Sequence, residues 1–150
     1  MTALSPDPNL HPTPAEAMRA PPKKIAYVAA LHVGTGIDKP DFIAVVDVDP
    51  KSDDYGRIIH KVELDETGDE LHHFGWNACS SMLCPYGDPT IERGYLIVPG
   101  LRSSNVYVLD TKPDPRRPRI VKKIPESQDI QGCTRYTAAR MRSASALSAD

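Results

Sequence analysis

Ile43-Ala-Val-Val-Asp47 begins the stretch that decides the fold of this chain. A proline-containing turn follows it, and then Arg57-Ile-Ile-His-Lys-Val62. The same arrangement returns where Val106-Tyr-Val-Leu-Asp110 and another proline-containing turn precede Arg119-Ile-Val-Lys-Lys-Ile124. The first strand recurs 63 residues later and the second 62 residues later. Short β-branched and aliphatic runs bounded by turn residues are typical of strands. A hairpin repeated at this distance indicates β-propeller blades, although any two hairpins look similar at this level.

Further apolar runs outside the repeat also predict strands. No window before the C-terminal segment carries apolar residues at helical spacing for three turns, so we expect an all-β fold. An α/β sheet with crossover helices is disfavoured for the same reason. The expected strands are Ile25–Leu31, Asp41–Asp49, Arg57–Leu64, Tyr95–Val98, Asn105–Leu109 and Arg119–Ile124.

These strands suffice for about two propeller blades. A propeller closes a ring of about four to eight blades, because each blade covers the apolar faces of its neighbours. We therefore expect the chain to be part of a longer propeller, with one open flank when it stands alone.

Three segments follow from the composition along the chain. Residues 1–23 form a proline-rich arm, in which Pro14-Ala-Glu-Ala-Met18 is expected to make one short helical turn. Residues 24–131 are the partial propeller, and residues 132–150 are a tail of different character.

Overall composition excludes several classes of function. The chain has 150 residues, of which 40% are hydrophobic and 25% charged, and its formal net charge is −2. This balance gives no reason to expect nucleic acid as a partner. No apolar run reaches the roughly 20 residues needed to span a bilayer, and the start of the chain lacks the pattern of a secretory signal. Three cysteines argue against a disulfide framework and favour a reducing cytoplasm.

The segment Asp69-Glu-Leu-His-His-Phe-Gly-Trp-Asn-Ala-Cys-Ser-Ser-Met-Leu-Cys84 is the most unusual in the chain. His72 and His73 are candidate metal ligands, because imidazole binds borderline metals. Cys79 and Cys84 do not have the CxxC spacing of zinc sites and redox motifs. In an extended strand adjacent histidines point to opposite faces, so sharing one metal requires the backbone to turn here. Hydrogen-bonded structural histidines and inert buried thiols remain the alternatives.

Two other groups of polar residues are expected to be structural. The basic run Arg116-Arg-Pro-Arg119 is interpreted as a solvated turn rather than a phosphate site. His60 alternates with Ile58 and Val62, which predicts that these three side chains share one face of a strand.

Several motifs resemble the selenium-binding protein family, whose members include methanethiol oxidases. The most specific is the string His-His-x-Gly-Trp-Asn-x-Cys-Ser-Ser, which begins at His72. The other matching elements are Asp41-Phe-Ile-Ala-Val-Val-Asp-Val-Asp-Pro-Lys-Ser52, Ile59-His60 and Leu96-Ile-Val-Pro-Gly-Leu-Arg-Ser-Ser-Asn-Val-Tyr-Val-Leu-Asp110.

The resemblance implies a seven-bladed propeller, of which this chain would form about the first two blades. It also implies copper-dependent oxidation of a small thiol: methanethiol, oxygen and water give formaldehyde, hydrogen sulfide and hydrogen peroxide. His72 and His73 match the family's paired histidines and are the implied metal ligands. Cys79 matches its cysteine after Trp-Asn, and a selenium compound bound through Cys79 or Cys84 is the non-catalytic alternative.

The sequence departs from the family at a few positions. Gly56 stands where animal members have a cysteine, and Met82 where many members have one. After Gln131 the family continues His-Thr-x-His-Cys-Gly-Pro, whereas this chain has Cys133-Thr-Arg-Tyr. Codons permitted for this tail yield the family motif in the neighbouring frame, so we expect out-of-frame translation over residues 132–150. A chain lacking that histidine motif is expected to be inactive alone, and an open propeller fragment without function is the remaining hypothesis.

Overall fold

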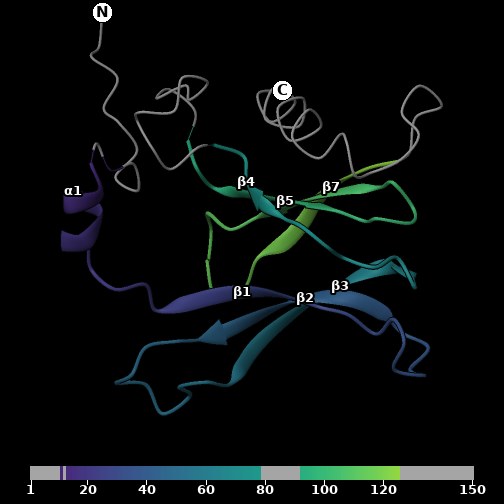
Figure 1. Ribbon diagram of the computed structural model, residues 1–150, viewed down its shortest axis with the longest axis horizontal. Helices are drawn as coiled ribbons and strands as arrows, with labels where there is room; N and C mark the ends of the chain where they lie inside the picture. The colour runs from purple at the N-terminus through teal and green to yellow at the C-terminus, as the bar shows by residue number, and fades with distance from the viewer. Residues whose placement is uncertain (1–10, 12, 79–91, 126–150) are drawn as a thin grey trace, which may run out of the picture.

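The computed structural model describes residue 11 and residues 13–78 and 92–125, which form one short helix and two antiparallel sheets (Figure 1). The first sheet has the order β1-β2-β3 and the second β4-β5-β6-β7. All six expected strands are present, which confirms the all-β prediction. The elements are α1 (Pro14–Arg19), β1 (Ile25–Ala30), β2 (Pro40–Asp47), β3 (Ile58–Thr67), β4 (Gly75–Trp76), β5 (Tyr95–Pro99), β6 (Val106–Asp110) and β7 (Arg119–Ile124).

The short helix α1 begins where the sequence predicts it. Thr13 is the N-cap, and its hydroxyl oxygen accepts a hydrogen bond from the Glu16 backbone N–H at 3.2 Å. Pro14 occupies the first helical position, where its missing N–H costs nothing. The helix has no buried residues, so it contributes little to the core. Within the described residues, no helix is long and apolar enough to cross a membrane.

The structure confirms the internal repeat in detail. β2 pairs with β3 and β6 pairs with β7, both antiparallel, and each pair has a register irregularity at the equivalent place, Val45/Val46 and Val108/Leu109. Such an irregularity adds one residue to one strand and breaks the alternation of faces. Two strand pairs that share this defect have the same architecture, so the resemblance between the hairpins is not a coincidence of composition.

The same irregularity corrects the prediction for His60. His60 lies opposite Val45, whereas Ile58 lies opposite Val46, so the two do not share a face as simple alternation implies. Ile58 is accordingly 50% exposed, while Val62 is buried.

The main core lies between the two sheets. Tyr107, fully buried within it, donates a hydrogen bond from its hydroxyl to the Asp65 carboxylate of β3 at 2.6 Å. Burial first, and this carboxylate second, raise the pKa of Tyr107 well above its usual range. Leu71, from the segment joining the sheets, completes the cluster, whose buried members are Ile43, Val62, Leu64, Leu71, Leu96, Val98, Tyr107 and Leu109.

The two sheets stack front to back. Ile43 of β2 faces the second sheet. Its equivalent in the repeat, Val106, belongs to a separate cluster with Ile97 and Val108 on the opposite face of that sheet. Equivalent faces therefore point in the same direction, as they do in neighbouring propeller blades. The two described sheets do not close a ring.

Candidate functional site

The paired histidines lie in an irregular segment that connects the sheets. β3 ends at Thr67, and Gly68 follows with φ 73°, a left-handed conformation that glycine adopts freely. Glu70 also has a positive φ of 61°, which is uncommon for a residue with a side chain. Leu71 then forms an isolated antiparallel bridge to Gly100. The backbone therefore turns just before the histidines, as a shared site requires.

The turn between β5 and β6 holds this segment from one side. The Asp69 carboxylate is 2% exposed and accepts hydrogen bonds from the backbone N–H of Ser103 at 2.8 Å and from its hydroxyl at 2.9 Å. Arg102 donates its backbone N–H to the Asp69 carbonyl at 3.0 Å. Its guanidinium Nε also bonds the Glu70 carboxylate at 3.0 Å. The segment is thus fastened by both backbone and side-chain contacts.

The first sheet holds the segment from the other side through Asp41. This carboxylate is completely buried in β2. Its Oδ2 accepts the Leu71 N–H at 3.1 Å, and its Oδ1 accepts the His32 N–H at 2.7 Å. The residue directly before His72 is therefore tied to both sheets.

His72 and His73 lie side by side at the surface. Their ring centroids are 5.1 Å apart and the rings meet edge-on, at 77°. Both residues are exposed. The Nε2 of His72 also lies 3.9 Å from a Glu70 carboxylate oxygen. The structure therefore brings the two predicted imidazoles together, although no set of three or more His, Cys, Asp or Glu among residues 11, 13–78 and 92–125 is arranged to hold a metal.

The remainder of the histidine motif serves packing. Phe74 and Trp76 pack against the main core, and the Trp76 indole meets the Tyr27 ring edge-on with centroids 5.9 Å apart. The Asn77 side-chain oxygen accepts the N–H groups of Gly94 and Tyr95. The motif thus divides into an exposed histidine pair and a structural half. The predicted thiols Cys79 and Cys84 lie outside the described residues, as does the tail from residue 132.

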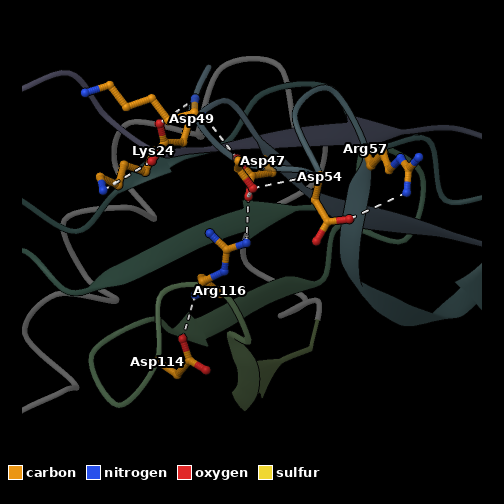
Figure 2. Close-up of polar contacts among 9 residues, drawn as sticks. Lys24, Asp47, Asp49, Asp54, Arg57, Asp114 and Arg116 are labelled. Atoms are coloured by element: carbon orange, nitrogen blue, oxygen red, sulfur yellow. Dashed lines mark hydrogen bonds and ion pairs between the residues drawn. The ribbon is translucent and has the colours of Figure 1, made fainter.

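A second polar cluster lies at the opposite end of β2 (Figure 2). Arg116, from the turn between β6 and β7, donates its Nη2 to the fully buried Asp47 carboxylate at 2.7 Å. This hydrogen bond first, and the Asp49 backbone N–H second, hold the pKa of Asp47 below its usual value. In the same turn, the Pro115 carbonyl accepts the Tyr27 hydroxyl at 2.7 Å. The basic run is therefore not simply a solvated turn, because Arg116 joins the two sheets.

Among the described residues the buried carboxylates are Asp41, Asp47 and Asp69, and sequence reasoning did not identify them as organising residues. A signal was available for two of them, since Asp41 and Asp47 flank an otherwise apolar run. Charged residues are rarely buried unless they are paired or hydrogen-bonded. Acidic residues inside an apolar run thus indicate specific partners, but they do not identify them.

This chain is similar in sequence to known proteins. The family model described as 56 kDa selenium binding protein (SBP56) matches residues 4–146. The chain is 49% identical over 112 residues to selenium-binding protein 1 of Arabidopsis thaliana and 47% identical over 119 residues to methanethiol oxidase of Mus musculus. These matches cover 75% and 79% of this chain.

A solved structure agrees with these relatives. The X-ray structure of a hypothetical selenium-binding protein from Sulfolobus tokodaii superposes with a TM-score of 0.74 and 65% sequence identity. The match covers 79% of this chain and 26% of that chain. The two curated relatives are covered over 22% and 24% of their length, so the chain spans about a quarter of the proteins it matches. On its sequence, its two stacked sheets and these matches, the chain belongs to the selenium-binding protein family.

Proposed function

We propose that this chain contributes His72 and His73 to the copper site of a methanethiol oxidase. The observation that carries the proposal is the juxtaposition of two exposed imidazoles on a segment tied to both sheets. Relatives named methanethiol oxidase, from Mus musculus and Xenopus tropicalis, support the assignment of the reaction.

The donor set fits copper in type. Imidazole is a good ligand for copper, and the two rings lie 5.1 Å apart. The two adjacent rings are the donors that this chain would offer to one shared ion. Both rings are at the surface, so neither must leave the core to bind. Two ligands are nonetheless an incomplete set, and ions held by so few groups bind weakly.

The residues of this chain would bind and orient the metal. The overall reaction converts methanethiol, oxygen and water into formaldehyde, hydrogen sulfide and hydrogen peroxide. Copper, when bound, would supply acidification of a coordinated thiol and a route for electrons to oxygen. Asp41 and Asp69 would hold the segment that presents the imidazoles, so that the two rings keep their relative orientation. The full activity is proposed for proteins that carry further ligands beyond the quarter spanned here.

Copper titration of three histidine variants tests the proposal. We expect the chain to bind Cu²⁺ weakly, and His72→Ala and His73→Ala each to lower the affinity by at least tenfold. His32→Ala is the matched control, because the His32 ring is occupied elsewhere: its Nδ1 donates to the Pro40 carbonyl at 2.9 Å and the ring packs on Phe42. Equal affinity in all three variants would rule out the proposed site.

An activity assay tests the expected lack of turnover. The copper-loaded chain should release no hydrogen peroxide from methanethiol, because two imidazoles do not control the geometry of the metal. Peroxide release that depends on His72 would contradict this expectation and show that the chain is sufficient for catalysis.

The second candidate function is binding of a selenium compound without catalysis. It is favoured by the match to the selenium-binding protein family model, and it would use Cys79 or Cys84, whose thiolates are the nucleophilic forms. Mass spectrometry after selenite treatment should show an adduct that is lost in Cys79→Ser or Cys84→Ser. Cys133→Ser is the control, and an adduct confined to Cys133 would exclude this function.

A further inference from the structure

We propose that Asp41 is the positioning residue of the histidine pair, setting the backbone direction from which His72 and His73 project. This inference rests on the proposed function, because it assigns a role in presenting metal ligands. Asp41 does not contact the imidazoles in this role; it acts through the backbone of Leu71.

The first argument is what the buried carboxylate binds. Both oxygens of Asp41 accept backbone N–H groups, one from His32 after β1 and one from Leu71 between the sheets. Leu71 lies 30 residues further along the chain. Hydrogen bonds to a charged acceptor are about twice as strong as neutral ones, and a buried site strengthens them further. Asp41 thus joins two irregular segments that share no strand pairing.

The second argument is where the contact falls. The N–H of Leu71 belongs to the peptide unit just before the one that joins Leu71 to His72. Because a peptide unit is planar, holding this N–H fixes the orientation of the backbone that leads into His72. The Leu71 side chain is 1% exposed in the core, and its backbone bridges Gly100 on the far side. The Leu71 side chain is buried, its N–H is bound by Asp41, and the Glu70 carbonyl before it accepts the Leu101 N–H at 3.2 Å, so the backbone that leads into the histidines has little freedom to reorient.

The third argument is that the neighbouring carboxylates do different work. Asp69, two residues before Leu71 in the same segment, binds Ser103 in the turn between β5 and β6. Asp65 accepts the Tyr107 hydroxyl and pairs with Lys123 at 2.8 Å, contacts that join β3 to the second sheet. Asp41 is the carboxylate that holds the amide next to the histidine pair, which distinguishes its role from general cohesion of the sheets.

The variant Asp41→Asn isolates this role. Asparagine keeps the size of the side chain but replaces one acceptor oxygen with an NH₂ group, so one of the two backbone N–H groups loses its partner. Residues that orient metal ligands typically change metal affinity by about 10- to 100-fold when altered. We expect a loss of Cu²⁺ affinity in that range and a changed electron paramagnetic resonance spectrum. Asp65→Asn, the matched control, should leave both unchanged.

A measurement on the unaltered chain keeps the test valid if Asp41→Asn does not fold. Coupling between two sites is reciprocal, so copper bound at the histidines should increase the hydrogen-exchange protection of the Leu71 amide. The amides of β7 should change less, because β7 pairs with β6 and contributes no residue to the core cluster that contains Leu71. No change at Leu71 on saturation with copper would overturn the role of Asp41.

The outcomes separate this inference from the proposed function. Copper affinity that falls in His72→Ala but not in folded Asp41→Asn overturns the positioning role alone. Copper affinity unaffected by His72→Ala overturns the proposed site and the positioning role together. Lower affinity in both variants, with the Asp65→Asn affinity unchanged, is the expected result.

Discussion

Gly100 offers a sharp test of how the histidine segment is held. A Cβ atom at this position would overlap the carboxylate of Asp69, which is buried and already bound by Ser103. Gly100→Ala must therefore displace the carboxylate or the backbone that carries it. Gly94 is the comparison position, because a Cβ there would overlap the Cγ and Cδ atoms of Lys112, a partly exposed side chain whose ion pair is with Glu92.

The magnitude follows from the contacts at stake. Asp69 accepts two hydrogen bonds, and a hydrogen bond to a charged group contributes about 1.5–3 kcal/mol. Alanine also restricts the unfolded chain, which returns about 0.4–1 kcal/mol. Losing one hydrogen bond therefore lowers the free energy of unfolding by about 1.5 kcal/mol. For a chain of 150 residues that corresponds to a fall in Tm of roughly 3–6 °C. Gly94→Ala should cost less than Gly100→Ala, since it displaces no buried carboxylate and the ion pair of Lys112 with Glu92 is exposed enough to contribute little.

Thermal unfolding provides the assay. Far-ultraviolet circular dichroism reports the sheets, and fluorescence of Trp76, the single tryptophan, reports the junction between them. Both signals should show the lower Tm in Gly100→Ala. If the two alanine variants unfold at the same temperature, Asp69 does not hold the segment as described.

Three further predictions concern the contacts between the sheets. Burial raises the pKa of Tyr27 from 10.0 to about 12, so between these values the folded state keeps the Tyr27 proton while the unfolded state loses it. The free energy of unfolding should therefore fall between pH 10 and 12. Tyr27→Phe should flatten that fall in urea titrations. Arg116 lowers the pKa of Asp47, which adds stability above pH 3.8 that disappears as the pH falls through the folded pKa. Arg116→Ala should lower Tm at neutral pH and weaken this acid dependence, whereas Arg117→Ala should do neither. Tyr107→Phe removes a hydrogen bond to a carboxylate and should cost about 1–2 kcal/mol in denaturant unfolding; an unchanged midpoint would contradict that role.

The strands and their repetition were predictable because their signals are local. Alternation, β-branched residues and turn residues act within a few positions of one another, so β2 and β6 could be recognised without a partner. The two-residue strand β4 could not. Gly75 and Trp76 form a strand only because the edge of β5 is there to pair with them.

The candidate site was predictable in its residue types but not in its construction. His72 and His73 are conspicuous as adjacent imidazoles, whereas their relative orientation depends on contacts from Asp41 and Asp69 that span 30 and 34 residues. Arg116 was interpreted as solvated for the same reason, since its partner Asp47 lies 69 residues away.

By itself, the sequence determined that this chain forms repeated antiparallel hairpins and that a histidine pair follows the first of them. Only the tertiary structure decided that the hairpins stack front to back, that the backbone turns before His72, and that buried carboxylates hold this turn from both sheets. The physical reason is the range of the interactions. Strand patterning reflects neighbours along the chain, while a buried charge is tolerated only where folding brings distant donors to it.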